Sequence, residues 1–288
     1  MKTFEQAYRV GRRYLQKRGV ESASFIAELL LRSVMGWDRT RLFSRFRDPM
    51  EPKIIHCYVH QIVQRAKGVP VQYLLGEQEF YGRVFQVGPS VLIPRPETEV
   101  LIETVLRETQ RIWKDSPITV VDAGTGSGAI AVTLAAERPL WQLVAVDCSS
   151  EALVTARKNG EQHGTNDRIR WLEGNWLTPL KESGVKMDVL VSNPPYIPTQ
   201  VIDTLDTQVK KYEPILALDG GKDGLDPYRI LVKQLPQYMN RPGLVAFEVG
   251  EGQSQKVKEI LENQLENTDV DIVSDLAGRS RIVIARIH

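Results

Sequence analysis

The chain has 288 residues, of which 42% are hydrophobic and 25% are charged. This composition is ordinary for a soluble globular protein, and two cysteines are too few for a disulfide framework. No apolar run approaches the roughly 18 residues that cross a bilayer, and the first ten residues lack the apolar core of a signal peptide. We therefore expect a cytoplasmic protein that makes no membrane contact.

The net charge of +1 is unevenly distributed along the chain. Residues 1–70 contain 14 Lys and Arg against 6 Asp and Glu, a surplus of eight positive charges, and the rest of the chain carries a surplus of seven negative charges. A basic first segment on an acidic body favours an anionic partner for that segment, although solvated helix faces explain the same pattern.

Cysteine and histidine give no metal-binding pattern. His56 and His60 stand four residues apart on a predicted helix, but no acidic or cysteine partner follows, so we predict no metal site. We expect Cys57 and Cys148 to be buried as small hydrophobic side chains.

Residues 1–70 are predicted to form a small helical domain with its own core. Phe4, Ala7, Gly11 and Leu15 follow helical spacing, and no strand pattern interrupts the segment. Residues 71–96 contain aromatic residues, Val and Gly, which predict a β-hairpin that turns near Tyr81–Arg83 and links two domains.

From residue 97 to residue 288, predicted helices and strands alternate. The expected helices are 97–113, 129–137, 150–163, 227–238 and 253–264. The expected strands are 118–122, 143–147, 169–173, 187–192, 244–249, 270–274 and 280–287. This alternation predicts an α/β fold in which a mostly parallel sheet is covered by helices on both faces.

A glycine-rich turn follows the first strand of this domain. The segment Asp122-Ala123-Gly124-Thr125-Gly126-Ser127-Gly128 joins an apolar strand to a helix, and Asp147 ends the next strand 23 residues after Gly124. Glycines allow a tight turn and close approach of a ligand, and a carboxylate at Asp147 can accept ribose hydroxyls. NAD(P) and S-adenosylmethionine both fit this pattern. Asp122 favours the second, because an acidic residue suits a cationic ligand better than a pyrophosphate.

The strongest catalytic pattern is Asn193-Pro194-Pro195-Tyr196, directly after the strand 187–192. Ligands of open parallel sheets bind beyond the carboxyl ends of the strands, so this tetrapeptide lies where chemistry is expected. Prolines stiffen the loop and remove N–H donors, which leaves oxygen acceptors from the Asn193 side chain and the Pro194 carbonyl. Two fixed acceptors can hold both N–H groups of a planar –NH2 and present its π face to an incoming methyl group.

These motifs resemble those of the release factor glutamine methyltransferases, the PrmC/HemK family. The similarity covers nearly the whole chain and includes the segments 75–82, 92–99, 193–198, 218–225 and 247–250. It implies a helical first domain, a hairpin linker and a Rossmann-like methyltransferase domain of seven strands, the last of them antiparallel. It also implies methylation of the glutamine in the Gly-Gly-Gln motif of class-1 peptide release factors, with conversion of S-adenosylmethionine to S-adenosylhomocysteine.

The resemblance also implies the site residues. Cofactor contacts fall on Gly124, Thr125, Gly126, Ser127, Gly128, Asp147, Trp176 and Asn193, and substrate contacts fall on Asn193, Pro194, Pro195 and Tyr196. We expect Asn193, Pro194 and Tyr196 to serve catalysis. One position departs from the family pattern, because Asn175 stands where members often carry Asp; we expect its oxygen to keep the contact with the cofactor.

Other functions remain open at this point. A glutamine methyltransferase for a ribosomal protein would share the catalytic loop, and an adenine-specific DNA or RNA methyltransferase also needs a planar –NH2. Against direct nucleic-acid binding, the body is acidic and lacks a basic stripe with interleaved aromatics. A non-catalytic module that binds a translation factor would not need two intact loops. We predict a monomer that acts on release factors.

Overall fold

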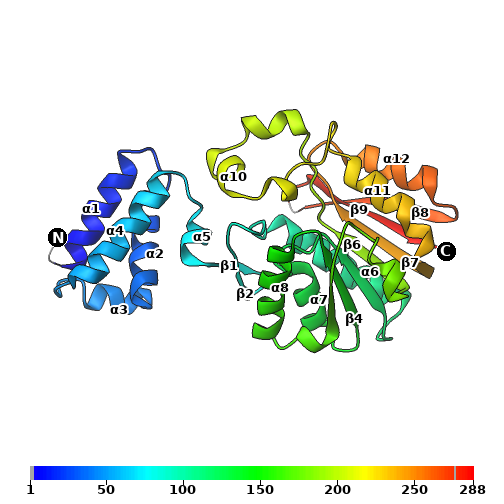
Figure 1. Cartoon of the computed structure of the whole chain (residues 1–288), viewed down its shortest axis with the longest axis horizontal. Helices are drawn as coiled ribbons and strands as arrows, with labels where there is room; N and C mark the ends of the chain where they lie inside the picture. The colour runs from blue at the N-terminus through cyan, green and yellow to red at the C-terminus, as the bar shows by residue number, and fades with distance from the viewer. Residues whose placement is uncertain (1–2, 276) are drawn as a thin grey trace. The chain divides into compact units, whose positions relative to one another are not determined.

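The computed structural model describes residues 3–275 and 277–288, which form two compact units (Figure 1). Unit 1 contains the residues up to Glu77 and the segment Asp206–Tyr212, and unit 2 contains Gln78–Leu205 and Glu213–His288. The hairpin that we expected as a separate linker packs within unit 2. Across the described residues, no helix has both the length and the apolar character needed to cross a membrane.

Unit 1 is helical, as its spacing predicts. Its helices are α1 (Phe4–Gln16), α2 (Ala23–Met35), α3 (Arg39–Ser44), α4 (Pro52–Ala66), α5 (Val71–Leu75) and α10 (Thr207–Tyr212). The sequence did not reveal α5 and α10, because helices of five and six residues are too short to show a periodic pattern. Gly11 brings α1 close to α4, since a Cβ at this position would lie 2.3 Å from the Tyr58 hydroxyl.

Unit 2 contains a sheet of seven strands in the order β5-β4-β3-β6-β7-β9-β8. The strands are β3 (Thr119–Ala123), β4 (Gln142–Asp147), β5 (Ile169–Glu173), β6 (Met187–Ser192), β7 (Met239–Glu248), β8 (Thr268–Ser274) and β9 (Ser280–Ile287). Strands β3 to β7 pair in parallel, and β9 runs antiparallel to both of its neighbours. The Rossmann-like fold and the antiparallel final strand are therefore confirmed.

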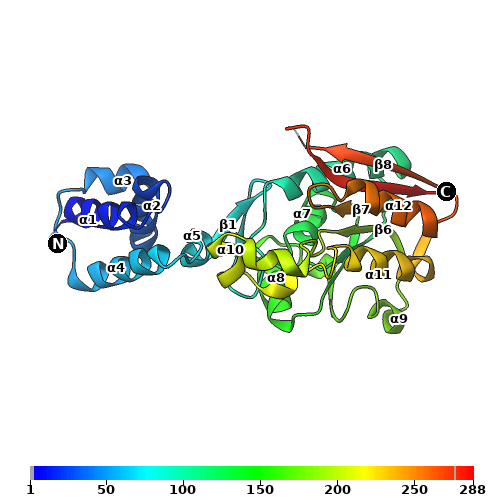
Figure 2. The ribbon, with the colours of Figure 1, turned by 90° about the horizontal axis from the view of Figure 1, so that it is seen from above.

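Helices cover both faces of this sheet (Figures 1 and 2). The remaining helices are α6 (Glu97–Ile112), α7 (Ala129–Glu137), α8 (Ser150–Gln162), α9 (Leu180–Ser183), α11 (Asp226–Gln234) and α12 (Ser254–Gln264), with 3-10 turns η1 (Asn166–Arg168), η2 (Thr199–Thr204), η3 (Ile215–Ala217) and η4 (Leu235–Gln237). Successive strand residues face opposite sides, so Val120 packs with α6 and α7 while Val121 packs with α11 and α12. Both faces are apolar, which explains the continuous hydrophobic strands of the sequence.

The hairpin consists of β1 (Glu77–Phe80) and β2 (Arg83–Gln86), and all of it except Glu77 lies in unit 2. Tyr81 and Gly82 form its turn, at the predicted place, and both have positive φ (50° and 67°). Such a turn matches the twist of paired strands. Phe80 and Phe85 are 1% and 0% exposed and join the core between the sheet and α6, which explains why the hairpin belongs to unit 2.

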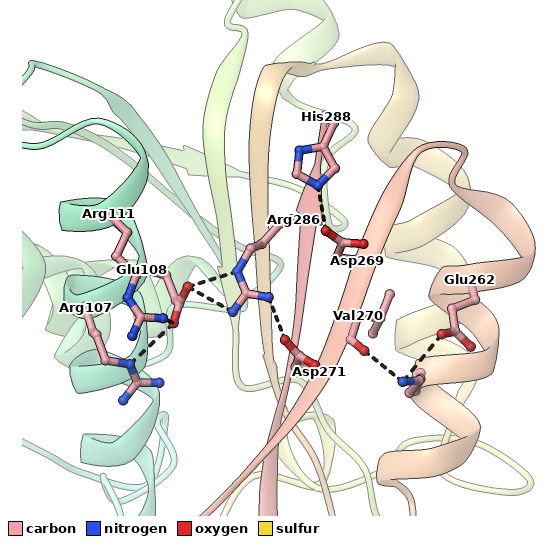
Figure 3. A network of polar contacts seen from close by, with 10 residues as sticks. Arg107, Glu108, Arg111, Glu262, Asp269, Val270, Asp271, Arg286 and His288 are labelled. Atoms are coloured by element: carbon pink, nitrogen blue, oxygen red, sulfur yellow. Dashed lines mark hydrogen bonds and ion pairs between the residues drawn. The ribbon is translucent and has the colours of Figure 1, made fainter.

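A buried carboxylate ties α6 to the end of the sheet (Figure 3). Glu108 accepts hydrogen bonds from Arg286 of β9 at 2.9 Å and from Arg111 at 3.0 Å, and Arg286 also donates to Asp271 of β8 at 2.6 Å. Burial raises the pKa of Glu108, but the hydrogen bonds and charges of the arginines outweigh burial and hold this pKa below its usual range. Loss of Arg286 would leave Glu108 only its two partners on α6 itself, Arg107 and Arg111, so Arg286 is the contact that fixes α6 on the sheet.

The expected burial of the two cysteines is wrong, because both side chains are exposed. The buried residues of α4 are Tyr58, Ile62 and Arg65, so Cys57 lies outside its inward face. Cys148 follows the end of β4, where the strand leaves the core. Free cysteine is buried in most proteins, so residue type alone gave the wrong prediction here.

Candidate active site

The predicted motifs meet at the point where the strand order of the sheet reverses. After β3 the chain proceeds outward through β4 and β5, and it then returns to place β6 on the other side of β3. In the β3–β6 pair, Val121 lies beside Leu190 and Asp122 beside Val191. The two loops that follow these strands are therefore neighbours, although about 70 residues separate them in the sequence. Crevices at such reversal points are the usual ligand sites of open α/β sheets.

The loop Gly124–Gly128, here called the glycine loop, turns tightly over the end of β4. Gly124, Gly126 and Gly128 have φ of 78°, 57° and 79°, which is costly for residues with a Cβ. The amides of Gly124 and Thr125 donate to the carbonyl of Val146 at 2.8 and 2.9 Å. These contacts fold the loop back onto the strand and leave Gly126 open to the adjoining cavity.

Asp122 supports the glycine loop from inside. Its carboxylate is fully buried, and Oδ2 accepts hydrogen bonds from the Thr125 hydroxyl at 2.6 Å and from the Ala131 amide at 3.2 Å. Burial raises the pKa of Asp122 to about 7, against the opposing effect of these two bonds. The side chain does not line the cavity, so the structure places its charge behind the loop.

Asp147 ends β4 at the cavity and is half-buried. Oδ2 accepts a hydrogen bond from the Gly126 amide at 2.8 Å, and Oδ1 accepts one from the Ser149 amide at 2.9 Å. Burial raises the pKa of this carboxyl, and the backbone donors oppose that shift. A carboxylate has about four acceptor positions, so the backbone donors do not use up its capacity to accept from ligand hydroxyls.

The segment Gly174–Trp176 forms another wall of the cavity. Trp176 has a φ of 53°, unusual for a bulky residue, and its ring lies 3.7 Å from the position that a Cβ on Gly124 would take. Gly174 is required by the turn, because a Cβ there would lie 2.4 Å from the Pro179 ring. Asn175 is exposed at the cavity rim.

The loop Asn193–Tyr196, here called the catalytic loop, is held from behind by backbone contacts. The side-chain amide of Gln253 donates to the Tyr196 carbonyl at 2.8 Å and accepts from the Gly250 amide at 3.0 Å. Gly220 lies so close that a Cβ on it would be 2.8 Å from both the Pro195 carbonyl and the Tyr196 Cα. The glycine-rich segment 218–225 is therefore a structural support of the catalytic loop.

The aromatic and amide side chains of the catalytic loop are half-buried. Burial raises the pKa of Tyr196 to about 12, so its hydroxyl remains protonated at neutral pH. The Asn193 side chain donates from Nδ2 to the Thr98 hydroxyl at 3.1 Å. Pro194, in the same loop, is buried.

One cavity of unit 2 joins these parts and has a volume of about 380 Å³. Its walls come from the segment before α6, the glycine loop, the end of β4, the segment after β5, the catalytic loop and the segment around η3. Among the lining residues are Leu92, Gly126, Asp147, Trp176, Asn193 and Leu216. This volume lies within the range of small-molecule sites.

Comparison with known proteins decides the family. Residues 6–76 match the PrmC N-terminal domain, and residues 97–217 match the methyltransferase small domain. The release factor glutamine methyltransferase of Moorella thermoacetica is 41% identical over 98% of this chain and 98% of its own length. That of Bacillus subtilis is 38% identical over 100% of this chain and 99% of its own length. The chain belongs to the release factor glutamine methyltransferase family.

Solved structures of lower identity share the fold of this family member. The hMettl16 catalytic domain, solved in complex with the MAT2A 3'UTR hairpin 6, superposes with a TM-score of 0.56 at 16% identity, covering 87% of this chain and 92% of that one. The ribosomal protein L11 methylase of Lactobacillus delbrueckii superposes with a TM-score of 0.50 at 19% identity, covering 73% and 90% of the two chains. These similarities confirm the methyltransferase fold, and at such low identity they carry no information about the substrate.

The family site residues that we predicted fall into two groups. Those that line the cavity are Gly124, Gly126, Asp147, Asn175, Trp176, Asn193 and Pro195. Those that lie next to it in the same loops without lining it are Asp122, Thr125, Ser127, Gly128, Pro194 and Tyr196. The first group lines the cavity in this conformation, and the second lies directly beside it.

Several residues of this family site were missed from the sequence. Gln253 and Thr98 support the catalytic loop, and Glu248 accepts a hydrogen bond from Thr98. Asn159 anchors the glycine loop by donating to the Ser127 carbonyl at 2.8 Å. The sequence signalled only two of these residues, because Thr98 and Glu248 fall in the family segments 92–99 and 247–250.

Proposed function

We propose that this chain transfers a methyl group from S-adenosylmethionine to the side-chain amide nitrogen of the glutamine in the Gly-Gly-Gln motif of class-1 peptide release factors. The proposal rests on one observation: a stiff loop of oxygen acceptors borders the same cavity as a glycine loop with its strand-end carboxylate. Membership of the family agrees with this activity.

The residues of the cavity fit S-adenosylmethionine, which supplies an electrophilic methyl group on a sulfonium when it is bound. Gly124 and Gly126 form a wall without Cβ atoms, and the free acceptor positions of Asp147 suit the two ribose hydroxyls. Trp176 offers an aromatic surface for the adenine, and Asn175 offers polar atoms at the rim. Asp122 would act on the cofactor through the shape of the loop, because its carboxylate is enclosed.

The catalytic loop would hold the glutamine amide by its two N–H groups. Asn193 Oδ1, in the cavity lining, and the Pro194 carbonyl, beside it in the same loop, would be the acceptors, and Tyr196 would supply an aromatic wall. Acceptance of both bonds orients the nitrogen and stabilises positive charge as it develops there. No general base is required before transfer, because the nitrogen becomes acidic only after it gains the methyl group.

A methylation assay tests this proposal. The protein is incubated with radiolabelled S-adenosylmethionine and a purified class-1 release factor, the same factor with Ala in place of the motif glutamine, a ribosomal protein fraction, or DNA and RNA. We expect label on the intact factor alone. Label on the ribosomal fraction or on nucleic acid, with none on the factor, would refute the proposed substrate.

The basic character of residues 1–70 suits an acidic face of the release factor. Arginines of unit 1 lie over aromatic rings, such as Arg18 over Tyr14 at 3.8 Å and Arg41 over Trp37 at 5.2 Å, which holds their charges in place. Salt screens exposed charges, because the Debye length becomes shorter as ionic strength rises. The KM for the release factor should therefore rise steeply between about 50 and 300 mM salt. A KM independent of salt would remove this role. The same proposal includes a monomeric, cytoplasmic enzyme.

A further inference from the structure

A chain of three polar side chains ends at Asn193. Thr98, in the first turn of α6, donates its hydroxyl proton to Glu248 Oε2 at 2.7 Å and accepts from Asn193 Nδ2 at 3.1 Å. Thr98 and Glu248 are 4% and 3% exposed, so water competes little for these bonds. The three residues come from α6, the catalytic loop and the end of β7, and they are 95 and 150 residues apart in sequence.

The direction of each hydrogen bond follows from the chemistry of the groups. An ionised carboxylate can only accept, so it takes the single hydroxyl proton of Thr98. The Thr98 oxygen then has only lone pairs left for Asn193, and it selects the –NH2 end of that amide. The opposite end, Oδ1, is thereby turned away from Thr98 and left for another donor.

We propose that Thr98 and Glu248 are positioning residues, which fix the side-chain amide of Asn193 so that Oδ1 accepts from the substrate –NH2. The inference rests on the proposed function and deepens it, because an amide rotated by 180° would present a donor to the substrate donor. Two N–H groups facing each other would repel the glutamine amide at the moment when positive charge develops on its nitrogen.

The surroundings keep Glu248 and its partner in place. The Tyr228 hydroxyl of α11 donates to the Glu248 carbonyl at 2.8 Å, which fixes the end of β7. Thr98 belongs to α6, which Glu108 and Arg286 tie to the sheet (Figure 3). The backbones that carry Glu248 and Thr98 are therefore held in place.

The charge of Glu248 makes this arrangement sensitive to pH. Burial raises its pKa to about 7; Thr98 and Asn193, which donate toward it, oppose that shift, as does Arg281 of β9, while Glu97 of α6 adds to it. Tyr196 and Tyr228, the other titratable groups beside it, remain protonated in this range. Once protonated, Glu248 can donate to Thr98, whose proton then becomes free to point at Asn193 and select the wrong amide orientation.

The decisive variants are Thr98→Val, which keeps the shape of the side chain, and Thr98→Ser, which keeps the hydroxyl. We expect Thr98→Val to lower kcat about tenfold at pH 8, with S-adenosylmethionine affinity within about threefold, and Thr98→Ser to retain most of kcat. Equal kcat for Val and Ser, or equal losses of kcat and cofactor affinity in the Val variant, would overturn the inference.

The pH profile separates positioning from general stability. The ratio of wild-type to Thr98→Val kcat should fall from about tenfold at pH 8 to about twofold at pH 6, because protonated Glu248 disorders the wild-type amide. Glu248→Gln should lower kcat at pH 8, and the change in this kcat ratio between pH 8 and pH 6 should be absent in that variant. Titration of the substrate or of Asp122 affects both proteins equally and therefore cancels in the ratio. A kcat ratio that does not change with pH would contradict the role of Glu248.

Failure of this inference is distinct from failure of the proposed function. Wild-type protein that binds S-adenosylmethionine but does not label the release factor refutes the function. Wild-type protein that labels the factor, with a Thr98→Val variant equal to Thr98→Ser, refutes only the positioning.

Discussion

The glycine loop and the catalytic loop follow neighbouring parallel strands, yet their chemistry is opposite. The first contains glycines with positive φ, and its backbone amides donate hydrogen bonds to the Val146 carbonyl and the Asp147 carboxylate. The second contains prolines, has few donors, and is supported by the neutral amide of Gln253 and the close approach of Gly220. Because we propose that the first loop binds the cofactor and the second holds the substrate, we expect cofactor affinity and turnover to depend on different residues.

The largest expected effect separates turnover from affinity at the catalytic loop. Asn193→Ala removes an acceptor whose bond strengthens as charge develops, so kcat should fall about 100- to 1,000-fold. Affinity for S-adenosylmethionine should change by less than about fivefold. Single-turnover methylation and calorimetric titration measure the two; equal losses would mean that Asn193 serves mainly the cofactor.

The second effect concerns the charged support of the glycine loop. The folded-state pKa of Asp122 is raised from 3.8 to about 7, so the folded protein binds a proton more tightly than the unfolded chain. The stabilising effect of this proton is complete below pH 4 and is lost as pH rises to 7, on the order of a few kcal/mol. Asp122→Asn should flatten the decline of unfolding free energy between pH 4 and 8, measured by urea denaturation. An unchanged slope would contradict the shift, and Glu248 contributes a remaining slope of the same sign.

Asp147→Asn is the counterpart of Asn193→Ala on the cofactor side. Loss of the charge weakens the bonds to Gly126, to Ser149 and to ribose hydroxyls, so affinity for S-adenosylmethionine should fall about 10- to 100-fold. With saturating cofactor, kcat should stay within about threefold. A loss confined to kcat would contradict the assignment of cofactor binding to the glycine loop and turnover to the catalytic loop.

Gly220→Ala tests the stiffness of the catalytic loop without touching a ligand group. The added Cβ meets backbone atoms at 2.8 Å, so the loop must move, and we expect about a tenfold fall in kcat. Gly88→Ala is the matched control, because nothing lies within 4 Å of its Cβ. A Gly220 variant as active as the Gly88 variant would show that the loop needs no support from this side.

The smallest effect is expected at Asn175. Asn175→Asp restores the charge common in the family at the exposed rim of the cavity, and we expect cofactor affinity to change by about fivefold, or about 1 kcal/mol. Direct binding measurements decide it. A hundredfold gain would show that the charge, rather than an oxygen acceptor, makes the contact.

Most of the fold could be predicted from the sequence, because its information is local. Apolar runs such as Val189–Val191 and the helical spacing of Phe4 to Leu15 place strands and helices to within a few residues. The turn at Tyr81 and Gly82 was found for the same reason. The short helices α5 and α10 were missed, since a single turn has no period.

Both loops were visible in the sequence by themselves, because each joins a strand end to residues of distinctive chemistry over a few positions. The strand order then decided that they share a cavity, by returning β6 to the side of β3. Only tertiary packing could reveal Thr98, Glu248 and Gln253 as supports of the catalytic loop, since their partners lie 57 to 150 residues away. The sequence does not indicate which group a threonine or glutamine will bond to, because its partner is decided only when folding excludes water and brings one acceptor within reach.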